Sequence, residues 1–257
     1  MKPVAEGRRG LQGLRVLVPR GGPWGDRVAD DVRRHGGEPV VAPLVAFAPP
    51  ADPAPLLAAV DELGRGGFDW LVVTSATTAD ALAEAGARVP GGTRVAAVGP
   101  ATRTACERAG LPVDLVPSAD SSGSGLAAVW PAGSARVLLP QSDLADPGLA
   151  RGLRALGADV RAVVAYRTVP VPVEPALRAD VAAGRIGAVL VTSGSVARQL
   201  SAQFGPLPPG TLVACLGPLT AAAVADAGLA VSLVAPDRSA AALVAALAAH
   251  VGQMPTA

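Results

Sequence analysis

The chain has 257 residues, of which 50% are hydrophobic and 17% charged, so it is long enough to bury the core of one large or two small domains. Its formal net charge is +1, and basic and acidic residues are interspersed, which argues against a nucleic-acid surface or a polybasic membrane surface. The N-terminal segment MKPVAEGRRG lacks the apolar core of a signal peptide, so we expect a cytoplasmic protein.

Short Val- and Leu-rich runs predict strands that are buried on both faces, and amphipathic segments between them predict covering helices. In chain order, we expect strands at residues 15–18, 39–42, 70–73, 94–98, 113–116, 136–139, 160–164, 189–191, 212–215 and 231–234. Strands and helices alternate along the whole chain. This alternation is typical of the α/β class with doubly wound parallel sheets.

One α/β unit occurs twice in the sequence. DWLVVTSATTADAL aligns with GAVLVTSGSVARQL, and residues 93–117 align with 211–235, at a constant offset of 118 residues. A second pair, LRVLVPRGG and ARVLLPQSD, aligns at an offset of 121 residues. The repeat therefore predicts two domains of the same fold.

The division of the repeat into domains has two solutions. A single crossing of the chain would put the boundary near residues 117–133, where serine and glycine gather. Two crossings would use the equivalent proline-rich segments 43–55 and 166–175. We favour two crossings, with domain 1 at residues 1–44 plus 169–257, domain 2 at residues 47–165, and linker strands at residues 45–47 and 166–168. Two connectors also predict a hinge.

Hydroxyl residues follow the apolar strands at equivalent places in both copies. A Ser or Thr at the carboxyl end of a parallel strand caps the next helix and leaves N–H donors that attract anions. Capping alone would explain any single residue, but the same polar rim in both copies favours a shared anionic ligand. The candidates are Ser75, Thr77, Gly99 and Thr102 in one copy, and Ser193, Ser195, Gly217 and Thr220 in the other.

Two glycine-rich stretches match no nucleotide-binding motif. PRGGPWG at residues 19–25 is neither a dinucleotide fingerprint nor a phosphate-binding loop, although its Arg20 is suited to holding a carboxylate. The counterpart of Arg20 in the repeat is Gln141. SSGSGLAA at residues 121–128 either caps a helix or contacts an anion through Ser121. No nucleotide cofactor is expected.

The remaining candidate residues are few. Tyr166 is the only tyrosine, and it stands at the second proposed crossing, where it either packs or donates a proton. Two cysteines and two histidines form no metal-binding pattern and no nucleophile–histidine triad. We therefore expect no metal site.

The segments VVTSATT, AAVGPATRTACERAG, VLLPQSDLADPGLARGLRALGADVRAVVAYRT, VLVTSGSVARQL and LGPLTAAAVADAG, in this order and spacing, resemble the uroporphyrinogen-III synthase family. The resemblance covers nearly the whole chain after the first dozen residues. It implies two flavodoxin-like domains joined by a two-stranded linker, with a ligand cleft between them. It also implies a cofactor-free cyclisation of linear hydroxymethylbilane, with loss of water and inversion of the last pyrrole, to give uroporphyrinogen III.

The resemblance assigns roles to several of the candidates. Tyr166 would protonate or orient the departing hydroxyl, and Ser75, Ser193 and Thr220 would fall on cleft positions. The family often has a basic residue in place of Gln141 and an asparagine in place of Thr77. We expect a monomer acting on a linear tetrapyrrole, without a nucleic-acid or membrane partner. The alternatives are a non-catalytic tetrapyrrole-binding or regulatory protein of the same fold, and a two-domain anion-binding protein of periplasmic type.

Overall fold

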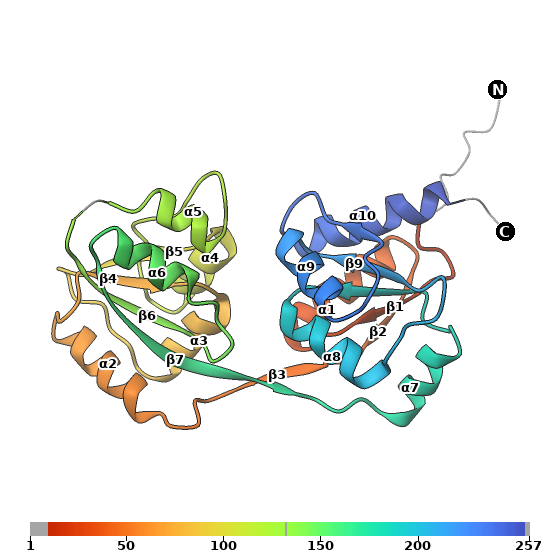
Figure 1. Ribbon diagram of the computed structural model, residues 1–257, viewed down its shortest axis with the longest axis horizontal. Helices are drawn as coiled ribbons and strands as arrows, with labels where there is room; N and C mark the ends of the chain where they lie inside the picture. The colour runs from red at the N-terminus through yellow and green to blue at the C-terminus, as the bar shows by residue number, and fades with distance from the viewer. Residues whose placement is uncertain (1–9, 132, 255–257) are drawn as a thin grey trace. The chain divides into compact units, whose positions relative to one another are not determined.

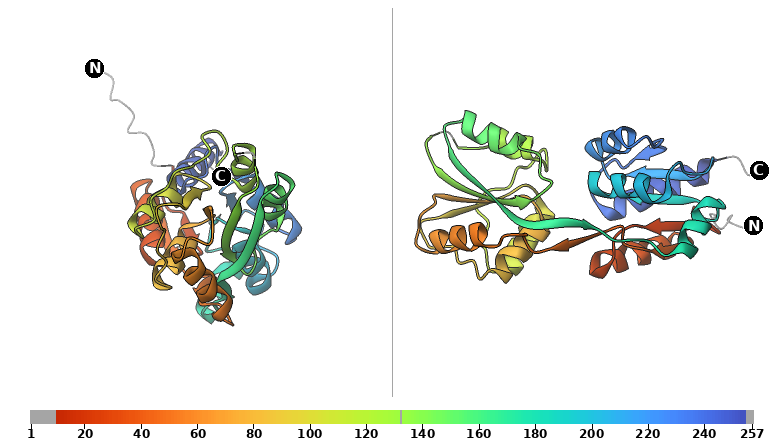
Figure 2. Two further views of the ribbon diagram at one scale, coloured as in Figure 1. Left: turned by 90° about the vertical axis from the view of Figure 1, so that its left-hand side faces the viewer. Right: turned by 60° about the horizontal axis from the view of Figure 1, so that its bottom comes forward.

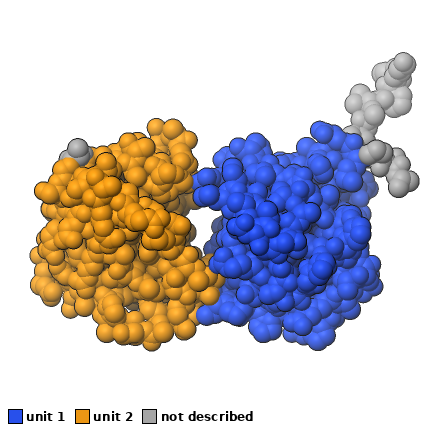
Figure 3. All heavy atoms as spheres, in the orientation of Figure 1, with its two compact units in different colours: residues 1–46, 169–257 blue, residues 47–168 orange. Residues whose placement is uncertain are grey.

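The chain divides into two compact units, which are drawn in different colours in Figure 3. The computed structural model describes residues 10–131 and 133–254. Unit 1 comprises the described residues up to Ala46 and from Val169 onward, and unit 2 comprises those of Phe47–Thr168. Residues 1–9, which make up most of the segment behind the cytoplasmic expectation, lie outside the described residues.

Two strands carry the chain from one unit to the other. They are β3 (Val45–Ala48) and β7 (Asp159–Pro170), which lie next to each other in one sheet (Figures 1 and 2). The expected linker segments, residues 45–47 and 166–168, are parts of these strands. A hinge at the two connectors remains a prediction.

Unit 1 contains a five-stranded parallel sheet with helices on both faces. The strand order is β10-β9-β8-β1-β2, which is the flavodoxin-like order. The strands are β1 (Arg15–Val18), β2 (Glu38–Val41), β8 (Ala188–Val191), β9 (Leu212–Cys215) and β10 (Leu233–Val234). One apolar core joins the sheet to α1 (Gly22–Arg34) and α10 (Ala240–Gln253). The other core joins it to α7 (Pro175–Ala182), α8 (Gly194–Phe204) and α9 (Pro218–Asp226).

Unit 2 repeats four of these five strands in the same order, and its fifth strand, β3, lies at the opposite edge of the sheet from the place that β10 takes in unit 1. Its order is β3-β7-β6-β4-β5, with β4 (Trp70–Val73), β5 (Arg94–Ala97) and β6 (Arg136–Ser142). Strands β7, β6, β4 and β5 take the places that β2, β1, β8 and β9 hold in unit 1. One core contains α2 (Ala54–Gly64), α3 (Ala76–Glu84) and α4 (Pro100–Arg108), and the other contains α5 (Gly123–Ala128) and α6 (Gly148–Ala155). The predicted doubly wound α/β fold is confirmed.

The strand predicted at residues 113–116 is wrong. In that segment, only Leu115 bridges to β5, at Ala96. The side chain of Asp114 explains the difference, because its carboxylate accepts the backbone N–H of Val95 at 2.7 Å, where a strand would present a carbonyl oxygen. In unit 1 the equivalent Ser232 accepts from a β9 backbone N–H at 2.9 Å, and β10 shortens from the predicted residues 231–234 to two residues.

Candidate functional site

Strand β4 of unit 2 leads directly into helix α3 through Ser75. All four residues of β4 are buried, so the chain leaves the core at this point. Ser75 has an extended backbone, and its Oγ accepts a hydrogen bond from the backbone N–H of Thr78 at 3.1 Å. This bond satisfies one of the N–H groups that the first helical turn leaves without a partner. The predicted cap is confirmed.

Tyr166 places its hydroxyl group on the same cap. Its Oη lies 3.3 Å from Ser75 Oγ, although the two residues are 91 positions apart in the sequence. The ring packs edge-on against Phe47, with ring centroids 5.3 Å apart. Tyr166 is half-buried, so packing fixes the ring without sealing off the whole side chain. The hydroxyl is therefore held at the edge of the sheet by one hydrogen bond and one aromatic contact.

The backbone at and just after Tyr166 is held by residues that sequence reasoning missed. The Asp143 N–H donates to the Tyr166 carbonyl oxygen at 3.1 Å. The Asp143 carboxylate accepts from the Thr168 N–H and from the Ser142 hydroxyl, both at 3.0 Å. The register between β6 and β7 shifts at Ser142, which lies opposite Tyr166. In the sequence, the polar pair Ser142-Asp143 at the end of an apolar run could have indicated these backbone contacts.

The second helix start in unit 2 brings Gly99 and Ser121 together. Gly99 is the N-cap of α4, and a Cβ atom at that position would lie 2.9 Å from Ser121 Cβ and Oγ. Glycine therefore allows the loop ahead of α5 to pack against the start of α4. Thr102, in the first turn of α4, is only 7% exposed, so its side chain is largely closed to a ligand.

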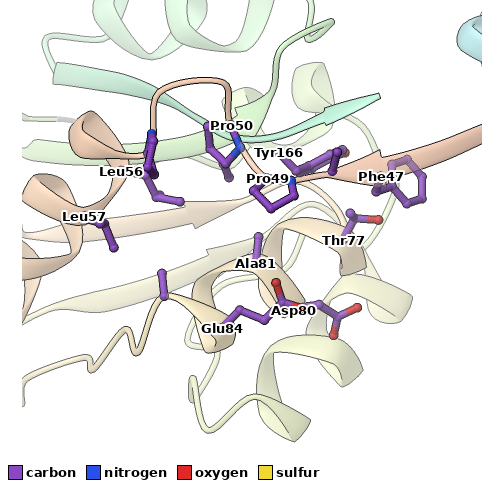
Figure 4. A pocket seen from close by; sticks show the side chains of 14 residues that line it. Phe47, Pro49, Pro50, Leu56, Leu57, Thr77, Asp80, Ala81, Glu84 and Tyr166 are labelled. Atoms are coloured by element: carbon purple, nitrogen blue, oxygen red, sulfur yellow. The ribbon is translucent and has the colours of Figure 1, made fainter. Parts of the chain in front are cut away.

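A pocket of about 310 Å³ adjoins the Tyr166 ring within unit 2. Figure 4 shows Phe47 and Tyr166 along one side and two α3 residues, Asp80 and Glu84, along the other. Thr77 also lines this pocket. Asp80 and Glu84 bring two carboxylates to a mostly apolar lining, but Asp80 forms an ion pair with Arg108 at 2.8 Å, which reduces its repulsion of an anionic group. We expect anions to bind at the helix starts, and Thr77 belongs both to this lining and to the first turn of α3.

Unit 1 has an equivalent serine cap without a tyrosine. Ser193 Oγ accepts from the Val196 N–H at 3.3 Å, which confirms the predicted cap of α8. The hydroxyl oxygens of Ser193 and Ser195 are 2.9 Å apart. The structure thus brings these two predicted residues together at one helix start.

The start of α9 in unit 1 pairs a glycine with an arginine. Gly217 is the N-cap of α9 and Pro218 is the first residue of the helix. A Cβ atom at position 217 would lie 3.5 Å from side-chain atoms of Arg238. Arg238 was missed because it follows a very short strand. Thr220, in the first helical turn, is 9% exposed. Like that of Thr102, its side chain is largely closed to a ligand.

Arg20 lies where β1 ends and before α1 begins. Its guanidinium carbon is 5.2 Å from the centroid of the Trp24 ring, a cation–π arrangement that orients the charge. The residue is half-buried. Its counterpart Gln141 lies within β6 and brings no charge to unit 2. The carboxylate-binding role of Arg20 remains a prediction.

The cysteines are packing residues. Cys106 and Cys215 are free and buried, and burial raises the pKa of each thiol from 9.0 to about 11, with a smaller contribution from Glu107 at Cys106. Both thiols are protonated at neutral pH and are poor nucleophiles. Within residues 10–131 and 133–254, no cluster of three or more His, Cys, Asp or Glu side chains is arranged to hold a metal ion. No helix in the same ranges is long and apolar enough to cross a membrane.

Comparison with known proteins decides the family. The sequence model described as uroporphyrinogen-III synthase HemD matches residues 26–245. The chain belongs to the uroporphyrinogen-III synthase family. Membership in this family gives the chain a role in tetrapyrrole biosynthesis, and no comparison supports the non-catalytic alternative. A search of curated proteins found no match.

Solved structures of the uroporphyrinogen-III synthase family share the fold. A substituted uroporphyrinogen III synthase from the extremely thermophilic bacterium Thermus thermophilus is 19% identical, covers 94% of this chain and 100% of its own, and has a TM-score of 0.66. A uroporphyrinogen-III synthetase from Helicobacter pylori is 17% identical, covers 92% of this chain and 99% of its own, and has a TM-score of 0.59. At these identities the likeness establishes the fold, and residue roles have to be argued from the site.

Proposed function

We propose that the chain catalyses the cyclisation of hydroxymethylbilane, with loss of water and inversion of the terminal pyrrole, to give uroporphyrinogen III. Membership in the family supports the reaction. The observation that carries the proposed roles is the 3.3 Å separation between Tyr166 Oη and Ser75 Oγ. It puts the only tyrosine of the chain at the carboxyl edge of a parallel sheet, where open α/β sheets bind ligands.

Tyr166 is the proposed general acid. The reaction breaks a C–O bond, and the departing hydroxyl leaves more easily as water than as hydroxide. A phenol hydroxyl is a hydrogen-bond donor at neutral pH, so Tyr166 donates its proton to the leaving oxygen. Ring closure at a pyrrole carbon releases a proton, so the whole reaction loses one molecule of water and the phenol recovers a proton. A positioned acid of this kind contributes a factor of roughly 10² to 10⁴ to the rate.

Neutral donors are the proposed carboxylate ligands. Hydroxymethylbilane carries an acetate and a propionate on every pyrrole, and helix N-termini bind such groups through N–H donors and a partial positive charge. The buried Thr102 and Thr220 contribute through their backbone. Neutral donors also permit release of the product more readily than a set of arginines would. The proposed substrate-binding residues are one charged residue, Arg20, and the neutral residues Ser75, Thr77, Gly99, Thr102, Ser121, Ser193, Ser195, Gly217 and Thr220.

The proposed reaction involves no change of oxidation state and no group carrier. Leaving-group assistance and control of substrate conformation therefore suffice, and we propose that the enzyme uses no cofactor. We also propose that it works as a cytoplasmic monomer without a nucleic-acid partner. The net charge of +1, spread over interspersed residues of both signs, supports the last point.

Turnover of hydroxymethylbilane tests the proposed function. Uncatalysed closure gives the type I isomer, so the products are oxidised to porphyrins and the ratio of type III to type I is measured. We expect type III to dominate and the substrate to disappear faster than in a protein-free reaction. A rate and an isomer ratio equal to those of the protein-free reaction, with tetrapyrrole binding retained in equilibrium dialysis, would favour the non-catalytic alternative.

A further inference from the structure

Thr78 is the most deeply buried member of the hydroxyl cluster at the start of α3. The residue is 0% exposed, and its Oγ1 lies 2.9 Å from Ser75 Oγ. Within the described residues, Ser75 Oγ is the one hydrogen-bonding partner of this hydroxyl. A buried hydroxyl proton without an acceptor is unfavourable. The Thr78 hydroxyl therefore donates to Ser75.

The bonds of Ser75 then decide the orientation of Tyr166. A serine hydroxyl has two lone pairs and one proton. Ser75 Oγ accepts from the backbone N–H of Thr78 at 3.1 Å and also from the Thr78 hydroxyl, so both lone pairs are occupied. Its proton is left for Tyr166 Oη, the third neighbour, at 3.3 Å. Ser75 is the donor to Tyr166, and the phenol proton points away from Ser75.

We propose that Thr78 is a positioning residue that sets the direction of this chain of hydrogen bonds. Because Thr78 fills the last lone pair of Ser75, Tyr166 presents a proton to its ligand. Without the Thr78 hydroxyl, Ser75 has a free lone pair that accepts the phenol proton, and Tyr166 then offers only its oxygen. The catalytic consequence rests on the proposed function, in which Tyr166 protonates the leaving hydroxyl.

The other copy of the repeat shows what happens where no tyrosine needs orienting. At an offset of 118 residues, Val196 stands in the place of Thr78 and is 1% exposed. Valine has the shape of threonine without the hydroxyl. At the other offset, 121 residues, Val45 stands in the place of Tyr166. A helix start of this kind thus accepts a buried valine, which makes Thr78→Val a substitution that the fold tolerates.

Neutron diffraction from deuterium-exchanged crystals of the wild-type protein tests the arrangement directly. We expect the Thr78 deuteron to point at Ser75 Oγ and the Ser75 deuteron to point at Tyr166 Oη. A Tyr166 deuteron directed at Ser75 would overturn the proposal. This test requires no turnover, so its result is independent of whether the proposed reaction is correct.

Kinetics of matched variants test the consequence for catalysis. Thr78→Val should lower kcat by about tenfold with little change in KM, a smaller loss than the roughly 10² to 10⁴ expected when the general acid itself is removed. Thr78→Ser should restore the wild-type kcat. In a Tyr166→Phe background, Thr78→Val should have no further effect, because the two act through one bond. Equal losses in both backgrounds, or no loss when Tyr166 is present, would contradict the proposal.

Thr93 provides the control for loss of a buried hydroxyl. It is 7% exposed, lies in unit 2 just before the start of β5, and donates to the Phe68 carbonyl oxygen at 2.6 Å. Thr93→Val should lower the melting temperature about as much as Thr78→Val does. It should leave kcat unchanged. A matching loss of kcat in Thr93→Val would show that the effect of Thr78→Val is general destabilisation.

Discussion

Units 1 and 2 share four equivalent strands in the same order and the same serine cap, but they differ in what lies against the cap. In unit 2 the hydroxyl of Tyr166 lies 3.3 Å from the Ser75 cap. In unit 1 the residue equivalent to Tyr166 is Val45, which is 6% exposed and belongs to the apolar core, and the Ser193 cap bonds instead to a neighbouring serine. The repeat therefore supplies a serine-capped helix start in both units, whereas a phenol hydroxyl lies against the cap in unit 2 and a buried valine takes its place in unit 1.

Replacement of Tyr166 by phenylalanine is expected to have the largest effect on this asymmetry. Tyr166→Phe keeps the ring contact with Phe47 and removes the hydroxyl. We expect the rate of type III formation to fall by roughly 10² to 10⁴, the contribution of one general acid. The product should shift toward type I, and the melting temperature should stay the same. Wild-type turnover by this variant would assign Tyr166 a packing role and leave catalysis to the shape of the site.

The buried thiols, one in each unit, test whether both cores are equally closed. Burial raises the pKa of Cys106 and Cys215 from 9.0 to about 11. The folded state therefore keeps these protons at pH values where the unfolded chain has lost them. The stabilisation is complete below pH 9.0 and is lost as the pH rises to about 11, by up to roughly 2–3 kcal/mol per thiol.

Urea unfolding at several alkaline pH values measures this loss. Cys106→Ala and Cys215→Ala should each flatten the decline of the unfolding free energy above pH 9, whatever they cost in packing at neutral pH. Similar flattening by both substitutions would indicate two equally closed cores. A decline that is unchanged in one variant would show that the thiol of that unit is reached by water.

Much of the fold was predictable because it depends on local signals. Strands buried on both faces need continuous apolar runs, and the constant offsets of the repeat give the two units the same order. The prediction at residues 113–116 failed because an apolar run cannot tell that the Asp114 carboxylate takes the N–H of a neighbouring strand. Competition of this kind between a side chain and the backbone depends on three-dimensional position.

The N-caps of the site could be predicted from the sequence, but the hydrogen bonds that join Thr78, Ser75 and Tyr166 could not. Ser75 and Ser193 were identified because an N-cap is a matter of a few adjacent residues. The approach of Tyr166 to Ser75 depends on a register shift between β6 and β7, which no sequence pattern announces. Thr78 was missed because a threonine inside a helix gives no sign of whether its hydroxyl faces solvent or another hydroxyl.

The most direct test of the claim that catalysis resides in one copy compares Ser75→Ala with Ser193→Ala. Both substitutions remove an N-cap, which lowers the unfolding free energy by about 1 kcal/mol in each case, and Ser75→Ala should cost more because it also removes the acceptor of the buried Thr78 hydroxyl. Kinetics with hydroxymethylbilane should separate them. We predict that Ser75→Ala lowers kcat at least tenfold, since it also releases Tyr166, whereas Ser193→Ala mainly raises KM. Equal effects of the two substitutions on kcat would contradict the claim.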